Sequence, residues 1–287
     1  MASPNPQEMQ KTLREAIVVS GIGIFTGEQV QVKICPAPVD TGLVFRRVDL
    51  PKTPEIPARL EFVQESSRCT RLGVKDVSIV MVEHLLSALY AYGIDNARIE
   101  VTGPEIPGSD GSAKLFVDLM EKTGFEIQEK PQRCMFIEQP LFWSRGDIHL
   151  VALPSPEFKL SYTMHYPRSP LIKSQYYSLC LNPSRYREEI ASCRTFSLYE
   201  DILPLLEKGL IKGGGLENAL VIQGDKILNP EGARFPDEMV RHKILDLIGD
   251  LSLVPPFLAH VVAVRSGHAS NNAFAKELFN HIVMEQL

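Results

Sequence analysis

One apolar segment of the sequence carries titratable side chains at helical spacing. It reads Val240-Arg241-His242-Lys243-Ile244-Leu245-Asp246-Leu247-Ile248-Gly249-Asp250. His242, Asp246 and Asp250 recur every four residues, so they lie along one face of the predicted helix. A histidine and a carboxylate at this spacing can reach one cation, but the same pair is also typical of a surface ion pair. The stretch alone therefore leaves two interpretations, a metal site and a solvated pair.

A second apolar helix, far upstream, begins in the same way. It reads Val82-Glu83-His84-Leu85-Leu86-Ser87-Ala88-Leu89, and its Val-x-His-x-Leu-x-x-Leu pattern matches the pattern from Val240 to Leu247. The match indicates an ancient duplication, in which His84 and His242 take equivalent places in two similar halves. Two histidines, one aspartate and a spare glutamate suit a catalytic zinc that keeps one coordination position open.

Strand-like alternation and helical periodicity recur on both sides of the middle of the chain. The first half is predicted to contain strands at 29–34 and 97–101 and helices at 82–92 and 112–124. The second half is predicted to contain a strand at 158–166, the helix at 239–250, a strand at 258–264 and a helix from about Asn271. This order favours an α+β fold of two similar sheet-and-helix domains in a layered sandwich, with the active site at the domain interface.

The 287 residues are enough for two domains. The polar segment 127–133 contains a proline and is the predicted linker. We therefore expect an N-terminal domain at 1–127 and a C-terminal domain at 128–287.

Composition excludes several classes of function. A net charge of −5 and 23% charged residues give no broad basic field for nucleic acid. The polar N-terminal stretch 1–16 has no apolar core and is not a secretory signal, and no apolar run approaches the roughly 20 residues of a membrane span. The five widely spaced cysteines form no CxxC pair, so free thiols in a reducing cytoplasm are expected.

Two further motifs contain residue types that are common in active sites. His268 lies in the turn Ser266-Gly267-His268 between the strand at 258–264 and the last helix, where polar side chains reach the edge of a sheet. Gly213-Gly214-Gly215 lacks the Lys-Ser/Thr of a phosphate loop, which argues against a nucleoside triphosphatase. The remaining histidines are expected to be structural or solvated: His149, His165, His260 and His281.

Taken together, these residues resemble those of the bacterial UDP-3-O-acyl-N-acetylglucosamine deacetylase family, zinc amidases of the first committed step of lipid A synthesis. The resemblance covers nearly the whole chain. It rests on these stretches: Gly21–Gly27, Val82–Leu89, Gly93–Asn96, Pro104–Pro107, Asp110–Ala113, Cys193–Phe196, Asn229–Gly232, Arg241–Asp250 and Ser266–His268.

The resemblance implies a set of site residues. The zinc ligands would be His84, His242 and Asp246, a two-histidine, one-carboxylate set in which Fe²⁺ could replace Zn²⁺. The general base would be Glu83, and the catalytic histidine His268.

The remaining roles follow from the same resemblance. Asp250 would orient His268, and the Thr195 hydroxyl would help to stabilise the oxyanion. Phe196 would pack near the uridine and Lys243 would meet phosphate or hydroxyl groups of the substrate. An insert at about 198–221 would shape a passage for the acyl chain. The expected partner is UDP-3-O-acyl-N-acetylglucosamine, bound by a cytoplasmic, monomeric enzyme.

Three positions depart from the family pattern. Phe25 stands where a histidine is usual, Met81 where threonine is common, and Gly108-Ser109 where a bulkier apolar pair is usual. These changes motivate an alternative of another class, a non-catalytic homologue that binds UDP-sugar or acyl lipid. A zinc peptidase is a third hypothesis, but the chain lacks the His-Glu-x-x-His signature. Asp110 has two interpretations, a loop residue and an anchor for the site.

Overall fold

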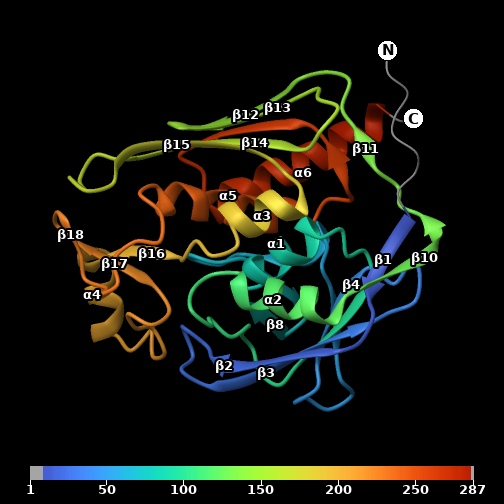
Figure 1. Cartoon of the computed structure of the whole chain (residues 1–287), viewed down its shortest axis with the longest axis horizontal. Coiled ribbons are helices and arrows are strands. Elements are labelled where there is room, and N and C mark those ends of the chain that lie inside the picture. Colours follow the sequence, from blue (N-terminus) through green and yellow to red (C-terminus); the bar gives the residue numbers. More distant parts are fainter. Residues whose placement is uncertain (1–8, 286–287) are drawn as a thin grey trace.

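Two five-stranded sheets enclose the helices in a computed structural model that describes residues 9–285 (Figure 1). The first sheet has the order β2-β3-β9-β4-β5. Its strands are β2 (Ile17–Ile22), β3 (Gln29–Pro36), β9 (Ala97–Val101), β4 (Leu43–Arg47) and β5 (Glu55–Pro57). The second sheet has the order β12-β13-β20-β14-β15. Its strands are β12 (Leu141–Arg145), β13 (Ile148–Leu153), β20 (His260–Val264), β14 (Lys159–Tyr166) and β15 (Lys173–Cys180).

Most of the helices fill the space between the sheets, so the layers run sheet, helices, helices, sheet (Figure 1). The helices are α1 (Glu83–Ala91), α2 (Lys114–Thr123), α3 (Pro183–Glu189), α4 (Tyr199–Glu207), α5 (Glu238–Leu251) and α6 (His268–Glu285), of which α4 lies to one side of the two sheets. Two smaller sheets have two strands each: β1 (Met9–Leu13) pairs with β10 (Phe125–Pro131), and β11 (Met135–Phe136) pairs with β19 (Phe257–Leu258). Two others have three strands each. One contains β6 (Val63–Gln64), β7 (Arg71–Val74) and β8 (Val77–Val80), and the other contains β16 (Phe196–Leu198), β17 (Leu220–Gln223) and β18 (Lys226–Ile227). The predicted α+β class is confirmed.

The two large sheets have the same topology. In each, two antiparallel pairings are followed by one parallel and one antiparallel pairing across the sheet. In each half a long-range parallel pair brings the last strand, β9 or β20, to the centre. The helix that carries a candidate histidine precedes that strand: α1 comes directly before β9, and only the two-residue β19 separates α5 from β20. The matching topology supports the duplication inferred from the two helix sequences.

The cores follow from strand alternation and from unusually apolar helices. On β3, Val30, Val32 and Ile34 are buried, whereas the residues between them are exposed. This alternation is typical of a sheet that packs on the core with one face and meets solvent with the other. Helix α5 buries almost every residue, charged ones included. A helix buried on all sides can satisfy its titratable groups only through one another, through a ligand or through its neighbours. The surface ion pair considered for this helix is therefore wrong.

Helices α1 and α5 approach closely at Gly249. A Cβ atom added to Gly249 would lie 2.2 Å from the carbonyl oxygen of Glu83 and 2.9 Å from its Cα. Only a residue without a side chain allows this contact, which sets Glu83 and His84 of one half beside α5 of the other.

We expect Gly249→Ala to destabilise the fold, although alanine favours a helix interior by about 1 kcal/mol. The new methyl group meets backbone rather than a flexible side chain, and overpacking of this kind costs about 1–3 kcal/mol. Urea unfolding of both chains measures the difference. Gly267→Ala is the control, since its Cβ would meet nothing within 4 Å. Equal free energies of unfolding for the Gly249 variant and the parent chain would contradict the close contact.

Element boundaries differ from expectation at several ends. Helix α2 begins at Lys114 rather than at Ser112, because Ser112 is engaged with Asp110 before the helix starts, although its hydroxyl accepts the Lys114 N–H. Helix α6 begins at His268, three residues before the predicted start, so the Ser-Gly-His turn leads directly into it.

The predicted linker 127–133 is not an irregular segment. Its first five residues belong to β10, which pairs antiparallel with β1. The domain limits 1–127 and 128–287 stay a prediction. Residues 1–8 of the polar N-terminal stretch lie outside the described part of the chain. Among the described residues, no helix is long and apolar enough to cross a bilayer, and the cysteines form no disulfide.

Candidate metal centre and active site

Three predicted ligands meet between α1 and α5. His84 from α1 and His242 and Asp246 from α5 are buried, and one ligand atom from each lies within 4.8 Å of the others. The Asp246 Oδ1 atom is 3.2 Å from His242 Nε2 and 3.7 Å from His84 Nε2. The two imidazole rings meet edge to face, with centroids 5.0 Å apart. The structure thus brings together the set predicted from two distant helices.

Burial and charge favour the forms of these groups that bind a cation. Burial, with His242 nearby, lowers the pKa of His84 to about 3, so its imidazole is neutral at pH 7. Burial alone raises the pKa of Asp246, but His242 and Lys243 outweigh it and hold that pKa well below its usual range. The result is a neutral histidine beside an ionised carboxylate.

The remaining nitrogen of His242 is fixed by the backbone. Its Nδ1 atom lies 3.0 Å from the Cys193 carbonyl oxygen, which can only accept a hydrogen bond. Nδ1 therefore donates to this carbonyl, and Nε2 is the nitrogen that faces Asp246 and His84.

The predicted acid and base lie on the other side of Asp246. His268 Nε2 is 3.8 Å from Glu83 Oε1 and 3.9 Å from Asp246 Oδ2. Its Nδ1 atom lies 3.0 Å from Asp250 Oδ2, so the predicted pairing of His268 with Asp250 is present.

Burial and the neighbouring charges together raise the pKa values of both Glu83 and His268. Burial raises the pKa of Glu83 to about 7, despite the opposing effect of His268. Burial lowers the pKa of His268, but Asp250 and Glu83 outweigh it and raise that pKa to about 10. The arrangement gives a base with a pKa near neutrality beside a protonated histidine.

Sequence reasoning missed the residues that support this pair. Thr70 donates its hydroxyl to Asp250 Oδ1 at 2.5 Å, and its N–H to Glu83 Oε2 at 3.0 Å. Asn271 donates to Asp250 Oδ2 at 2.8 Å. Thr70 comes from a short loop before β7 whose sequence shows no periodicity. No sequence signal relates it to helices 13 and 180 residues away.

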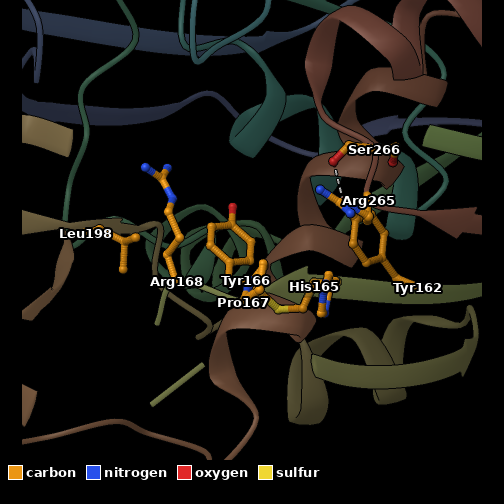
Figure 2. A pocket seen from close by; sticks show the side chains of 9 residues that line it. Tyr162, His165, Tyr166, Pro167, Arg168, Leu198, Arg265 and Ser266 are labelled. Carbon is orange, nitrogen blue, oxygen red and sulfur yellow. Dashed lines mark hydrogen bonds between the residues drawn. The ribbon is translucent and has the colours of Figure 1, made fainter. Parts of the chain in front are cut away.

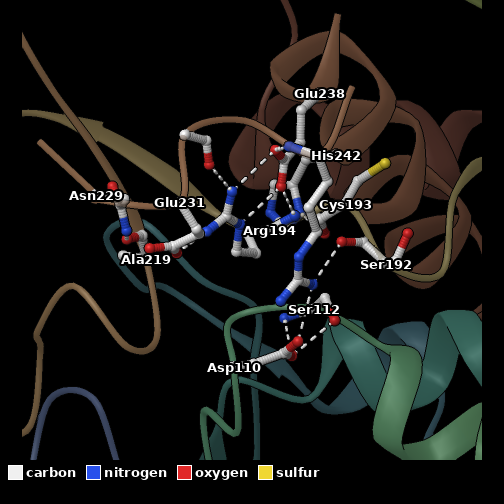
Figure 3. Close-up of polar contacts among 12 residues, drawn as sticks. Asp110, Ser112, Ser192, Cys193, Arg194, Ala219, Asn229, Glu231, Glu238 and His242 are labelled. Atoms are coloured by element: carbon white, nitrogen blue, oxygen red, sulfur yellow. Dashed lines mark hydrogen bonds and ion pairs between the residues drawn. The ribbon is translucent and has the colours of Figure 1, made fainter. Parts of the chain in front are cut away.

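A buried ion pair that sequence reasoning also missed holds the segment before Thr195 against α5. The Arg194 side chain is 2% exposed and the Glu238 side chain is fully buried. Glu238 Oε1 accepts the Arg194 backbone N–H and its Nε–H, both at 2.9 Å. Glu238 is one turn before His242, so this pair fastens the Cys193 carbonyl next to its histidine partner (Figure 3).

Asp110 enters the same network. It pairs with Arg234 at 2.8 Å and accepts the Ser112 hydroxyl, while the Arg234 N–H donates to Glu238 Oε2 at 2.6 Å (Figure 3). Asp110 thus links the loop before α2 to the base of α5, which supports its interpretation as an anchor.

We expect Glu238→Gln to lower the free energy of unfolding at pH 7 by up to about 3–5 kcal/mol, because Arg194 loses its fully buried counter-charge and keeps only Glu231, whose side chain is 57% exposed. Burial alone raises the pKa of Glu238, but hydrogen bonds from Arg194 hold it below its usual value. The ion-pair contribution is therefore complete above about pH 4.3, the value of an unfolded glutamate, and is lost as the pH falls through the folded-state pKa.

Urea unfolding at pH 7 and at several pH values below 4 measures this effect. The gap between the parent chain and Glu238→Gln should narrow in acid. Glu55→Gln is the matched control, since Glu55 pairs with Arg46 at the surface and its side chain is 56% exposed. A gap that stays constant over the whole pH range would argue against an ionised Glu238.

The two predicted substrate-contact residues connect the metal centre to a cavity. Lys243 Nζ lies 2.8 Å from Asp246 Oδ2 and 5.5 Å from the centroid of the Phe196 ring. Phe196 in turn packs edge to face on Tyr166, with centroids 5.7 Å apart. Tyr166 lines a cavity of about 380 Å³.

That cavity combines aromatic and cationic side chains, and its wall reaches Ser266, close in sequence to His268. Its polar lining includes Arg168 and Arg265 (Figure 2). Ser266, two residues before His268, also lines it, and its buried hydroxyl has no hydrogen-bond partner among residues 9–285. Tyr162 donates its hydroxyl to the Ser266 carbonyl. His165, expected to be structural, lies on this wall as well.

Other predicted positions stand further from the cluster or reach it only through the backbone. Thr195 donates its N–H to the Gly111 carbonyl at 2.8 Å, which joins the Arg-Thr-Phe segment to the loop before α2. The Phe25 N–H donates to the buried Glu105 carboxylate at 2.9 Å, and the Phe25 carbonyl accepts from the Lys212 N–H of the predicted insert. Met81, with φ of 62°, occupies the left-handed region directly before Val82 and α1.

The fold and the site define an α+β protein of two matching halves that share a buried His-His-Asp cluster beside a Glu-His-Asp constellation. Residues 10–280 match the family model described as UDP-3-O-acyl N-acetylglycosamine deacetylase. The chain belongs to this family.

Curated relatives agree over almost the full length. The chain is 46% identical to the UDP-3-O-acyl-N-acetylglucosamine deacetylase of Chlamydia pneumoniae, over 95% of this chain and 97% of that protein. It is 45% identical to the protein of that name from Chlamydia trachomatis serovar L2, over 96% and 97%. With the one from Chlamydia felis it shares 44% identity over 96% and 99%.

Proposed function

We propose that this chain hydrolyses the acetamide of UDP-3-O-acyl-N-acetylglucosamine and releases acetate, the committed step of lipid A biosynthesis. The observation that carries the proposal is the position of Glu83 and His268 within 4 Å of each other and beside the Asp246 carboxylate of the cation cluster. This places an acid, a base and a cation site around one point, as amide hydrolysis requires.

The donor set fits a divalent metal. A neutral His84, a His242 whose Nε2 is left free by its bond to Cys193, and an ionised Asp246 form the open three-ligand set of catalytic zinc sites. Iron also accepts two histidines and a carboxylate, and we propose zinc or Fe²⁺. When bound, such an ion polarises the carbonyl and lowers the pKa of water to about 7.

The chain's own residues supply the proton transfers. Glu83, with its pKa near 7, takes a proton from the attacking water. His268, held protonated by Asp250, stabilises the developing oxyanion and donates a proton to the departing amine. The amine must be protonated because an amide anion is too basic to leave. Thr195, on the segment tied to His242, is proposed as a further donor to the oxyanion.

The cavity beside Ser266 suits the nucleotide part of the substrate. Arg168 and Arg265 match the charge of a diphosphate, and Tyr166 offers a ring face to uracil. Lys243 and Phe196 stand between this cavity and Asp246, where the sugar would lie.

The insert is proposed to receive the acyl chain. Helix α4 buries none of its side chains. Exposed leucines in the insert are Leu203, Leu206, Leu210 and Leu216. The Phe25 segment contacts this insert through Lys212 and Gly213, so the departure at Phe25 concerns substrate contacts rather than the cation cluster.

The test is acetate release from UDP-3-O-acyl-N-acetylglucosamine by the purified chain, in metal-free form and after loading with Zn²⁺ or Fe²⁺. Activity that appears only on loading supports the proposal and identifies the metal. UDP-N-acetylglucosamine is the control, since it lacks the acyl chain and should be a poorer substrate.

The alternative of a non-catalytic homologue that binds UDP-sugar or acyl lipid is not favoured. The family and the relatives carry the name of a deacetylase, and Glu83 and His268 lie beside a buried cluster of His84, His242 and Asp246, which supports the proposed chemistry. Binding of the substrate without acetate release under every metal condition would reverse this judgement. Cytoplasmic location and a monomeric state stay predictions.

A further inference from the structure

Thr70 contacts both catalytic carboxylates at once. It is 1% exposed and lies directly before β7, outside the helices that carry the acid and the base. Its backbone N–H donates to Glu83 Oε2 at 3.0 Å, and its hydroxyl lies 2.5 Å from Asp250 Oδ1. One residue thus joins α1 of the first half to α5 of the second through two hydrogen bonds.

The direction of the Thr70 hydroxyl is fixed by its second neighbour. Asn272 Nδ2 lies 3.3 Å from Thr70 Oγ1, and an amide nitrogen can only donate. The hydroxyl therefore accepts from Asn272 and must direct its single proton to Asp250. A chain of donors runs from Asn272 through Thr70 to the Asp250 carboxylate.

The hydrogen bonds to Asp250 fix the orientation of its carboxylate. Oδ1 accepts from Thr70, and Oδ2 accepts from Asn271 at 2.8 Å and from His268 Nδ1 at 3.0 Å. A carboxylate held by donors on both oxygens keeps the plane in which His268 Nδ1–H points at it. The His268 ring then keeps Nε2 toward Glu83 and Asp246.

The backbone N–H has the matching effect on Glu83. It occupies Oε2, so Oε1 is the oxygen that faces His268 Nε2 at 3.8 Å. Glu83 therefore presents one defined oxygen to the reacting atoms.

We infer that Thr70 is a positioning residue for the reaction: its hydroxyl sets the orientation of His268 through Asp250, and its N–H selects the reactive oxygen of Glu83. The inference rests on the proposed deacetylase function. It assigns a role to a loop residue that touches neither the cation ligands nor the nucleotide cavity, and it predicts an effect on turnover without an effect on binding.

Thr70→Val tests the hydroxyl, because valine keeps the shape and the backbone N–H. We expect kcat for acetate release to fall about 10–100-fold, as for other residues that orient a catalytic group, with KM and zinc affinity unchanged. Thr70→Ser keeps the hydroxyl and should restore most of kcat. Thr12→Val is the matched control, since Thr12 is 3% exposed and donates its hydroxyl to the Asn96 carbonyl at 2.6 Å. It should lose stability but keep kcat.

A second variant and a second measurement cover the case in which Thr70→Val does not fold. Asn272→Ala removes the donor that aims the hydroxyl and should lower kcat in the same sense, by less. Independently of activity, the Nδ1–H proton of His268, assigned by its absence in His268→Gln, should give a low-field NMR signal that Thr70→Ser keeps and that Asn272→Ala weakens.

The outcomes separate the inference from the function on which it rests. Unchanged kcat in Thr70→Val, or in Asn272→Ala where the valine variant is unfolded, overturns the role of the hydroxyl. An equal loss of kcat in Thr12→Val would show that the loss in Thr70→Val comes from lower stability, and this result would also overturn the inference. A parent chain that releases no acetate overturns the proposed function, and the His268 proton signal then decides alone whether Thr70 orients that ring.

Discussion

Replacing Glu83 with glutamine and His268 with alanine in one chain is expected to lower acetate release by several orders of magnitude. Each group transfers a proton in the reaction, and general acid or base catalysis contributes about 10²–10⁴-fold. The two side chains face each other across 3.8 Å, so they act on one another and their losses should not simply multiply.

The single variants show how the two groups share the proton transfers. Glu83→Gln keeps the volume of the side chain and the oxygen that accepts from Thr70, so its loss reports the base rather than the fold. Zinc content should stay at the parent level in both single variants, because neither residue belongs to the ligand set. Initial rates of acetate release and bound metal per chain are the two measurements.

His260→Ala is the control for loss of a histidine. His260 is half-buried and hydrogen-bonds to Ser161 at 2.9 Å on β14 of the second sheet, so its removal should not alter the rate. A Glu83→Gln, His268→Ala chain that retained substantial turnover would show that neither group carries the proton transfers, and the mechanism would have to be abandoned.

What the sequence reveals of this site depends on whether a contact is local or depends on the tertiary fold. His242 and Asp246 share a helix face, so their common reach follows from spacing alone. The pairing of that face with His84 follows from the repeated pattern, because duplicated halves place equivalent helices at one interface. The matching order of the two sheets is the structural form of the same signal.

Contacts made by single loop residues have no such pattern. Thr70 contacts Asp250, 180 residues away in the sequence, and Arg194 contacts Glu238, 44 residues away. No sequence repeat or periodicity predicts either contact. Gly249 shows the same limit, because a glycine within a helix is commonly a weak point. The approach of the Glu83 backbone, which no sequence pattern shows, is the reason we expect a side chain at this position to be unfavourable.

Helix α5 itself provides the sharpest test of the metal centre, because it repeats one chemical group at two positions with different roles. Asp246→Asn and Asp250→Asn are the same substitution one turn apart, both at buried sites. Asp246 stands 3.2 Å from His242 Nε2, whereas Asp250 is occupied by Thr70, Asn271 and His268. Both variants should lose activity, but only the first should lose metal.

We expect Asp246→Asn to weaken Zn²⁺ binding by more than about 100-fold, since even the outer partners of metal ligands are worth about 10–100-fold. Chelator competition measures the affinity, and thermal unfolding gives a second readout. Zinc at 100 times its dissociation constant should stabilise the parent chain and Asp250→Asn by about 2.7 kcal/mol, but not Asp246→Asn. Equal zinc affinity in the two variants would remove Asp246 from the ligand set. Loss of zinc in both would instead make Asp250 a fourth ligand, which its three donors argue against.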